Sequence, residues 1–480
     1  MAGSCCAARA KNSPPATRWC STISAARSTE PASGSISMSL LSGMDWDRLT
    51  IGDAVRRSAA RGPGTVAVVD GDRRVTFASL DRRADELAHG LHAHGIGHGD
   101  QVAVWLTNGF EWVCCWIACA RLGAVVVPIN TRYKAGEVQY ILQQSDAKAL
   151  ILMDRYWNID FLGMAQAMVP GLDAATPGDI RSAALPQLRS VILWKSVEAP
   201  GTLNLDAIAA RGAACMDGAA KLPEVRASDP AIIVYTSGTT GHPKGAMHNH
   251  TILRNAANVA RMMQVEAGDV VLGHMPFYHV AGCIGTVGMS LLVGCTLVTL
   301  PHWNADEALE VIERERVTAF GGIPTHFVDC LDAIRRRPRD TSCLKSAWIG
   351  GAPVTPDVAL AARKELQLKA LLASYGMTET SASTTLSEFD APLEVLCDNK
   401  GKPVGDFELS IRDGAGDALP VGETGELWVR GHIVMMGYYK DPQATAEVMT
   451  PDGWFRTGDL GVFDEAGYLK ITGRLKDMFI

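Results

Sequence analysis

Helical and extended hydrophobic patterns alternate along most of the chain. Residues 76–95, TFASLDRRADELAHGLHAHG, repeat apolar positions every three or four residues, as an amphipathic helix does. Short apolar runs are typical of buried strands, and examples are DQVAVWL (100–106), GAVVVPI (123–129), AKALILM (147–153) and SVILW (190–194). Because strands that alternate with helices form parallel sheets, residues from about 45 to 400 predict an α/β fold with helix-covered sheets.

The pattern changes after residue 401 to shorter strands separated by turns. GKPVGDFELSIRD (401–413), GETGELWVRG (422–431) and GYLKITGR (467–474) predict a small β-rich subdomain. The predicted organisation is a disordered leader (1–43), paired α/β subdomains (44–400), a β-rich subdomain (401–473) and a terminal stub (474–480).

The first 43 residues lack apolar periodicity. They are rich in Ser, Ala and Arg, and Glu30 is their only acidic residue. This composition predicts disorder, and it leaves open both an organelle transit peptide and sequence upstream of a start at Met38 or Met44.

Composition narrows the class of protein. A formal net charge of −7 over 480 residues argues against a protein whose main function is to bind nucleic acid. Cys114, Cys115 and Cys119 lie in an apolar stretch without nearby histidines, which indicates reduced core thiols and a cytoplasmic location, with organelle import left open. The segment 112–130 is interrupted by Arg121 and Gly123, so it predicts a helix and a core strand rather than a membrane span.

The segment YTSGTTGHPKG (235–245) follows an apolar run that predicts a buried strand. A loop at the end of such a strand is where open α/β sheets bind ligands. Its glycines allow close approach of backbone N–H groups to an anion, and Lys244 adds a positive charge suited to a phosphate. Lys244 follows Pro243 and precedes Gly245, so the segment is not a Walker A loop.

Six further motifs follow this loop in order: MPFYHVAG (275–282), IGGAPV (349–354), ASYGMTET (373–380), GELWVRG (425–431), DGWFRTGDL (452–460) and GYLKITGRLKD (467–477). The set resembles the adenylate-forming superfamily, which includes acyl-CoA synthetases, aryl-CoA ligases, luciferases and peptide-synthetase adenylation domains. The resemblance implies the two α/β subdomains of that large domain. It also implies activation of a carboxylic acid by ATP and Mg²⁺ to acyl-AMP, then transfer of the acyl group to coenzyme A.

The resemblance assigns roles to particular residues. The implied catalytic residues are Lys244, Thr378, Glu379 and His279, with Thr236 and Glu379 holding magnesium. Tyr375 is expected to stack on adenine, and Asp459 and Arg474 to contact the ribose. The full implied nucleotide site comprises Thr236, Ser237, Gly238, Thr239, Thr240, Gly241, Lys244, Gly351, Ala352, Pro353, Ser374, Tyr375, Gly376, Met377, Thr378, Asp459 and Arg474.

The acyl pocket is expected near His279 and Gly376. His279 is assigned to positioning of the acid and not to proton transfer. Acetate-activating relatives carry a tryptophan at the position of Gly376, so glycine predicts an open pocket for medium-chain, long-chain or cyclic acids. The alternative is that Gly376 only supplies a backbone conformation or close packing.

The chain departs from the family at its end. Lys476 matches the hinge residue, and the family's small C-terminal domain with its catalytic lysine does not follow. The sequence therefore predicts slow adenylation by this chain and leaves open a nucleotide- and acyl-binding module with little turnover. An amino-acid-activating domain is disfavoured, because no carboxylate lies near FYHVAG to hold an ammonium group. The particular acid, a homodimer, and a carrier-protein thiol in place of coenzyme A are left open.

Overall fold

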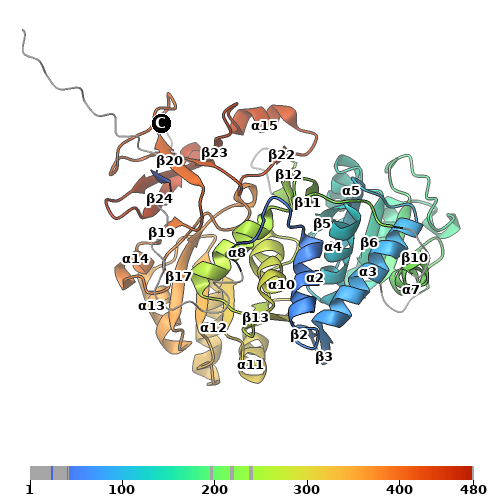
Figure 1. Cartoon of the computed structure of the whole chain (residues 1–480), viewed down its shortest axis with the longest axis horizontal. Coiled ribbons are helices and arrows are strands. Elements are labelled where there is room, and N and C mark those ends of the chain that lie inside the picture. Colours follow the sequence, from blue (N-terminus) through green and yellow to red (C-terminus); the bar gives the residue numbers. More distant parts are fainter. Residues whose placement is uncertain are drawn as a thin grey trace, which may run out of the picture.

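In the computed structural model, the described residues are 23–24, 41, 43–194, 198–216, 221–236 and 242–477. They form two large β-sheets with helices on their faces (Figure 1), which confirms the predicted α/β class. The predicted leader 1–43 lies almost entirely outside the described residues, apart from Ile23–Ser24, Leu41 and Gly43.

The smaller sheet has 8 strands, and its first six are parallel neighbours. Its order is β10 (Leu203–Asn204), β9 (Ser190–Trp194), β6 (Ala149–Met153), β4 (Gln101–Trp105), β5 (Val125–Pro128), β11 (Pro230–Thr236), β12 (Lys244–Asn249) and β22 (Gly437–Tyr438). The four apolar runs expected to be strands are β4, β5, β6 and β9. Their side chains are almost all buried, as expected for parallel strands covered on both faces.

The larger sheet has 14 strands and contains both parallel and antiparallel parts. Its parallel part is β2 (Val66–Asp70), β14 (Thr296–Thr299), β13 (Val270–Gly273), β15 (Ala319–Gly322), β16 (Ser346–Gly350) and β17 (Ala370–Tyr375), flanked by antiparallel β3 (Arg73–Thr76). The remaining strands are β18 (Thr385–Leu386), β19 (Lys400–Pro403), β24 (Leu469–Arg474), β23 (Phe455–Phe463), β21 (Gly425–Arg430), β20 (Glu408–Arg412) and β1 (Ile23–Ser24).

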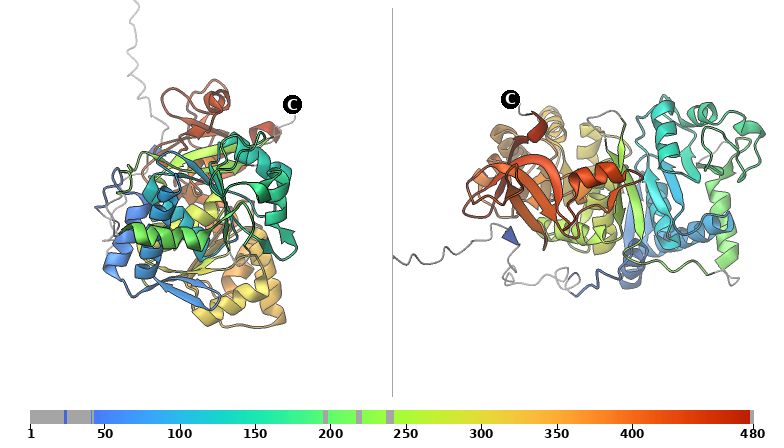
Figure 2. Two further views of the ribbon diagram at one scale, coloured as in Figure 1. Left: turned by 90° about the vertical axis from the view of Figure 1, so that its right-hand side faces the viewer. Right: turned by 90° about the horizontal axis from the view of Figure 1, so that it is seen from above.

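Strand β19 joins the antiparallel strands to the rest of the large sheet. Its pairing with β18 on one side and β24 on the other places the segment 400–474 beside the parallel strands. Seen from above, this orange-to-red segment lies toward the opposite end of the molecule from the teal-to-green helices α5 (Ala135–Gln144), α6 (Phe161–Met168) and α7 (Leu205–Met216) (Figure 2, right). The sequence pattern predicted short strands here, and the boundaries assigned to a separate subdomain stay a prediction.

Capping residues mark the ends of some of the helices. Helix α2 (Ile51–Arg61) starts with a capping box between Thr50 and Asp53, and α4 (Phe110–Leu122) ends at the left-handed Gly123, φ 73°. The others are α3 (Phe77–Ala93), α5 (Ala135–Gln144), α6 (Phe161–Met168), α7 (Leu205–Met216), α8 (Ile252–Met263), α9 (Val280–Gly282), α10 (Met289–Val293), α11 (Ala305–Glu315), α12 (Pro324–Arg336), α13 (Pro356–Glu365), α14 (Leu393–Cys397) and α15 (Pro442–Val448).

Helix α4 is the apolar segment that sequence reasoning assigned to the core. Every one of its residues is buried, and Cys114, Cys115 and Cys119 are free thiols there. The predicted helix and core strand are confirmed, and the reduced state of the cysteines stays a prediction. Among the described residues, no helix is both long and apolar enough to cross a bilayer.

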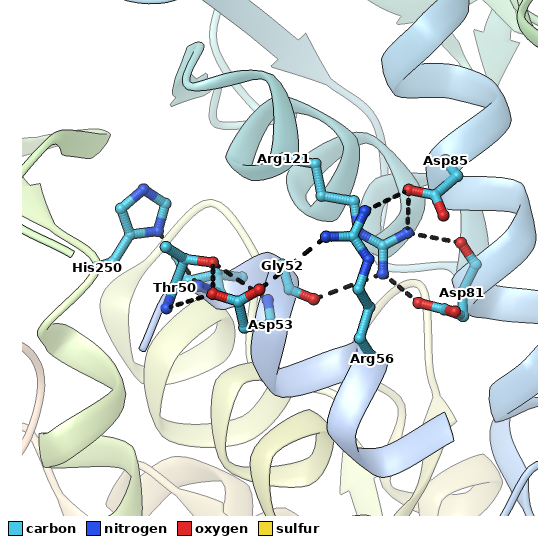
Figure 3. A network of polar contacts seen from close by, with 9 residues as sticks. Thr50, Gly52, Asp53, Arg56, Asp81, Asp85, Arg121 and His250 are labelled. Carbon is cyan, nitrogen blue, oxygen red and sulfur yellow. Dashed lines mark hydrogen bonds and ion pairs between the residues drawn. The ribbon is translucent and has the colours of Figure 1, made fainter. Parts of the chain in front are cut away.

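Arg121 is a buried cation that ties α4 to its neighbours (Figure 3). Its side chain is 1% exposed and forms ion pairs with Asp81 and, at 2.9 Å from Nη1, with Asp85 of α3. It also lies against Gly52 of α2, where an added Cβ would come within 2.7 Å of Arg121 Cγ. A full positive charge is therefore accommodated in the core because carboxylates surround it.

Replacing Arg121 with methionine is expected to lower the free energy of unfolding by about 3 kcal/mol, because both aspartates lose their buried partner. Urea denaturation measures the change. Arg155→Met is the matched control, since the exposed Arg155–Asp160 pair should contribute about 1 kcal/mol or less. Equal losses in the two variants would show that the buried network does not stabilise the fold.

Candidate active site

The predicted phosphate loop connects β11 to β12. Thr236 and Lys244 are direct partners across this antiparallel pair, and Thr236 Oγ1 donates to the Lys244 carbonyl oxygen at 3.4 Å. Residues 231–234 are buried, so the expected strand before the loop is confirmed. Ser237, Gly238, Thr239, Thr240 and Gly241 lie outside the described residues, and their assignment stays a prediction.

A cavity of about 290 Å³ lies at the carboxyl ends of several strands. It brings together three residues that the sequence had placed in one site: Thr236 at the end of β11, His279 after β13 and Thr378 after β17. The remaining lining residues are Pro128, Asn130, Tyr133, Tyr235 and Tyr278. Ligands of open α/β sheets bind at this edge of the sheet.

His279 faces the cavity and begins the short helix α9. Its Nδ1 accepts a hydrogen bond from the Ala281 N–H at 3.3 Å. The ring keeps surface open to the cavity, yet the surrounding protein lowers its pKa by desolvation. The lowered pKa favours the neutral imidazole at neutral pH, which can donate a hydrogen bond to a carboxylate without forming an ion pair. This state suits positioning of an acid.

Tyr375, Asp459 and Arg474 form a second cluster at the junction of the parallel and antiparallel strands. The Tyr375 hydroxyl donates to Asp459 Oδ2 at 2.7 Å, and Arg474 Nε lies 3.3 Å from Asp459 Oδ1. Asp459 and Arg474 are direct partners on β23 and β24. Desolvation and the Asp459 charge raise the pKa of Tyr375, so its hydroxyl remains a donor. Sequence reasoning named all three residues without predicting their mutual contacts.

The segment Gly351–Ala352–Pro353, called the GAP segment here, follows the strand beside the one that carries Tyr375. Gly351, Ala352 and Pro353 follow β16 and are exposed, while Tyr375 ends the neighbouring strand β17. The two strands are parallel, and Gly350 pairs with Ser374. Their carboxyl ends therefore present the exposed GAP backbone and the Tyr375 ring at the same edge of the sheet.

Ser374 and Met377 are also near these strand ends. Ser374 Oγ lies 3.4 Å from Ser383 Oγ. Met377 packs on a small apolar cluster of Ala246, Met435 and Phe455. Both residues therefore have structural partners, and direct contact with nucleotide stays a prediction.

The space beside Gly376 differs from the sequence-based interpretation. A Cβ built there would come within 1.6 Å of the Ala382 carbonyl oxygen and 2.9 Å of Ser383 Cα. Gly376 is also absent from the residues that line the 290 Å³ cavity. The glycine is needed for close approach of two backbone segments, so it does not support an open acyl pocket. A tryptophan at this position would require the backbone to move.

Thr378 and Glu379 lie on a buried turn that contacts the hairpin formed by β11 and β12. His248 of β12 bonds through Nε2 to the Thr378 carbonyl oxygen at 2.8 Å, so the ring donates there. Glu379 is 7% exposed, and its Oε1 accepts from the Tyr438 hydroxyl at 2.8 Å. The Lys244 ammonium lies 5.2 Å from the centre of the Tyr438 ring. Tyr438 thus lies between two predicted catalytic residues.

Sequence reasoning missed Tyr438 and the cavity tyrosines. Tyr438 stands in the short run GYYK, which carries no pattern beyond a two-residue strand. Its contact with Glu379 depends on pairing of β22 with β12, where Tyr438 faces Ala246. Lys476, the predicted hinge, is exposed in the short turn Leu475–Asp477, and its role stays a prediction.

The described residues contain no cluster of three or more metal-binding side chains. Magnesium commonly takes only one or two protein carboxylates and keeps phosphate and water ligands. The buried Glu379 carboxylate, with one oxygen bonded to Tyr438, fits a single protein ligand of this kind. Thr236 lines the 290 Å³ cavity together with Thr378, the residue before Glu379, so its hydroxyl is a second candidate ligand.

Comparison with known proteins shows the class to which this fold and site belong. The profile of the family described as AMP-binding enzyme matches residues 55–439, and the chain belongs to this family. The predicted resemblance is confirmed, and the class is that of AMP-forming acid–thiol ligases, which use ATP, Mg²⁺ and coenzyme A.

Two curated relatives illustrate the range of this class. The human medium-chain acyl-CoA ligase ACSF2, a mitochondrial protein, is 34% identical over 449 residues, covering 90% of this chain and 72% of the relative. A Mycobacterium tuberculosis CoA ligase for a methyl-dioxo-octahydro-indenyl propanoate is 35% identical over 446 residues. The match covers 90% of this chain and 81% of the relative.

A solved structure shows the same architecture. The N-terminal domain of FACL13 from Mycobacterium tuberculosis is 29% identical to this chain, with a TM-score of 0.74. The match covers 89% of this chain and all of that domain, 100%. The chain therefore has the large-domain fold of acyl-CoA ligases.

Proposed function

We propose that the protein activates a medium-chain or compact cyclic carboxylic acid to its acyl-CoA thioester. In the first step a carboxylate oxygen attacks the α-phosphorus of ATP, the bond to pyrophosphate breaks, and acyl-AMP forms. In the second step the coenzyme A thiol attacks the acyl carbon, its proton is lost, and AMP leaves. The observation that carries this proposal is the cavity shared by Thr236, His279 and Thr378.

The residue roles in this proposal follow from charge and position. Lys244 neutralises phosphate charge beside the hairpin loop, and Thr378 donates to the α-phosphate. Glu379 and Thr236 would hold magnesium, which, when bound, offsets the negative charge that otherwise opposes approach of a carboxylate. His279, neutral and facing the cavity, orients the acid.

The adenosine site in the proposal is the second cluster. Tyr375 stacks on adenine beside the exposed backbone of Gly351–Pro353, and Asp459 accepts from the ribose hydroxyls. Arg474 is 66% exposed on its side chain, so it can turn from Asp459 toward the sugar or phosphate. The contacts of Tyr375 and Arg474 with Asp459 support a pre-formed nucleotide site.

Acid size is inferred from the cavity and not from Gly376. A volume of about 290 Å³ is at the small end of ligand pockets, which span roughly 300–1,000 Å³. This favours a medium-chain acid over a long one. Tyr133, Tyr235 and Tyr278 line the same cavity, and their rings also favour cyclic or aromatic acids as the second candidate class. A cytoplasmic location and a homodimer stay predictions.

An acid panel tests this proposal. Acid-dependent exchange of labelled pyrophosphate into ATP should become more efficient from acetate to octanoate, by about fourfold for each buried methylene. Hexadecanoate should fall below octanoate, because its chain exceeds the cavity. Cyclohexanecarboxylate and benzoate test the second class. Highest efficiency with acetate, or with hexadecanoate, would contradict the size inference.

A further inference from the structure

Tyr438 connects the two parts of the candidate site that carry opposite charges. It lies on β22, whose partner β12 begins at Lys244. The backbone on either side is fixed, because Tyr438 N donates to Thr445 Oγ1 at 2.9 Å and Tyr439 N donates to the Gly245 carbonyl at 2.8 Å. The ring is therefore held in place by the strand that carries the lysine.

The Tyr438 hydroxyl is a lasting hydrogen-bond donor to Glu379. The phenol oxygen lies 2.8 Å from Glu379 Oε1, and because a carboxylate oxygen accepts, the phenol is the donor. A second contact fixes the glutamate backbone, since Met435 N donates to the Glu379 carbonyl at 2.8 Å. Both contacts come from the segment that leads into β22, so this segment sets the position of the glutamate.

One oxygen of the Glu379 carboxylate remains available. Tyr438 occupies Oε1, and within the described part of the chain no group is bonded to Oε2. A carboxylate that binds a metal through one oxygen is commonly oriented by a hydrogen bond to the other. The same tyrosine holds a cation on its ring, with the Lys244 ammonium 5.2 Å from the ring centre.

We propose that Tyr438 is a positioning residue for magnesium: its hydroxyl holds the Glu379 carboxylate so that Oε2 points to the metal of the magnesium–ATP complex. This inference rests on the proposed function, which assigns magnesium to Glu379. The tyrosine acts through the glutamate and does not itself contact the reacting atoms. Its ring contacts Lys244 and its hydroxyl contacts Glu379, so one side chain lies between the two charges assigned to the triphosphate and its metal.

The experiment separates magnesium-dependent from magnesium-independent nucleotide binding. Calorimetry measures ATP affinity with magnesium and with a chelator, and the ratio is the gain due to magnesium. Tyr438→Phe removes the hydroxyl and keeps the ring over which Lys244 lies. We expect this ratio to be about 10- to 100-fold smaller in the variant than in the unmodified protein. The affinity for ATP without magnesium should be unchanged. The retained affinity also reports that the site is folded.

Tyr439→Phe is the matched control. Tyr439 is the next residue, and its hydroxyl lies 3.5 Å from Asp146 Oδ2, away from Glu379. It should bind magnesium–ATP and ATP alone like the unmodified protein. Glu379→Gln is measured beside it, because it tests the metal assignment on which the inference rests.

The outcomes are distinguishable. Loss of the magnesium gain in Tyr438→Phe and Glu379→Gln, with Tyr439→Phe unchanged, is the expected result. A full gain in Tyr438→Phe with a lost gain in Glu379→Gln would overturn the role of Tyr438 and leave the proposed function intact. Equal losses with and without magnesium in Tyr438→Phe would indicate a purely structural role and also overturn it. A full gain in Glu379→Gln would refute the metal assignment itself.

Discussion

Replacing Lys244 with alanine is expected to weaken magnesium–ATP binding by about 10- to 100-fold, because a charge-assisted contact contributes about 1.5–3 kcal/mol. Acyl-adenylate formation should slow further, by about 100- to 1,000-fold in total, since the lysine also offsets charge that develops during transfer. Calorimetry gives the first effect and pyrophosphate release the second.

Lys402→Ala is the matched control for this lysine. Lys402 also lies over a tyrosine ring, with its ammonium 4.4 Å from the centre of Tyr468, and it pairs with Glu388 at 2.6 Å. It is not among the residues that line the 290 Å³ cavity. Loss of magnesium–ATP affinity in this variant, or full affinity in Lys244→Ala, would contradict the role assigned to Lys244.

Replacing Glu379 with glutamine should abolish most of the advantage that magnesium gives to ATP binding, again by about 10- to 100-fold. Glutamine keeps the size and can still accept from Tyr438, so the change isolates the carboxylate charge. Affinity for ATP without magnesium should be kept or slightly raised, because a negative charge near the triphosphate is removed.

Glu423→Gln is the control for this second change. Glu423 is exposed in the turn before β21, so its charge should not affect a metal at the cavity. Magnesium titrations at fixed ATP compare the two variants directly. An unchanged magnesium requirement in Glu379→Gln would remove this glutamate from the metal site.

The parallel core could be predicted from local pattern alone. β4, β5, β6 and β9 are short apolar runs buried on both faces, and α4 is mostly apolar and fully buried, with Glu111 and Arg121 as its charged residues. Such elements are specified by their own residues, so their type is readable in a single sequence. The predicted phosphate loop also follows the end of an apolar strand, β11, as expected.

The contacts between distant segments could not be predicted in this way. Tyr438 meets Glu379 only because β22 pairs with β12, and no local pattern encodes that register. For Gly376, the lack of a side chain was interpreted as space for an acyl group. In the structure the Ala382 backbone occupies that space. A glycine in a sequence does not reveal whether a ligand or another backbone segment approaches it.

The most direct test is binding of a stable mimic of octanoyl-AMP, in which a sulfamoyl group replaces the phosphate. If the acyl cavity and the adenosine cluster form one continuous site, each half of the mimic gains from attachment of the other. We then expect affinity at least about 100-fold above that of AMP or octanoate alone, measured by calorimetry. A mimic that binds no more tightly than AMP would show that the cavity beside His279 does not receive the acyl group.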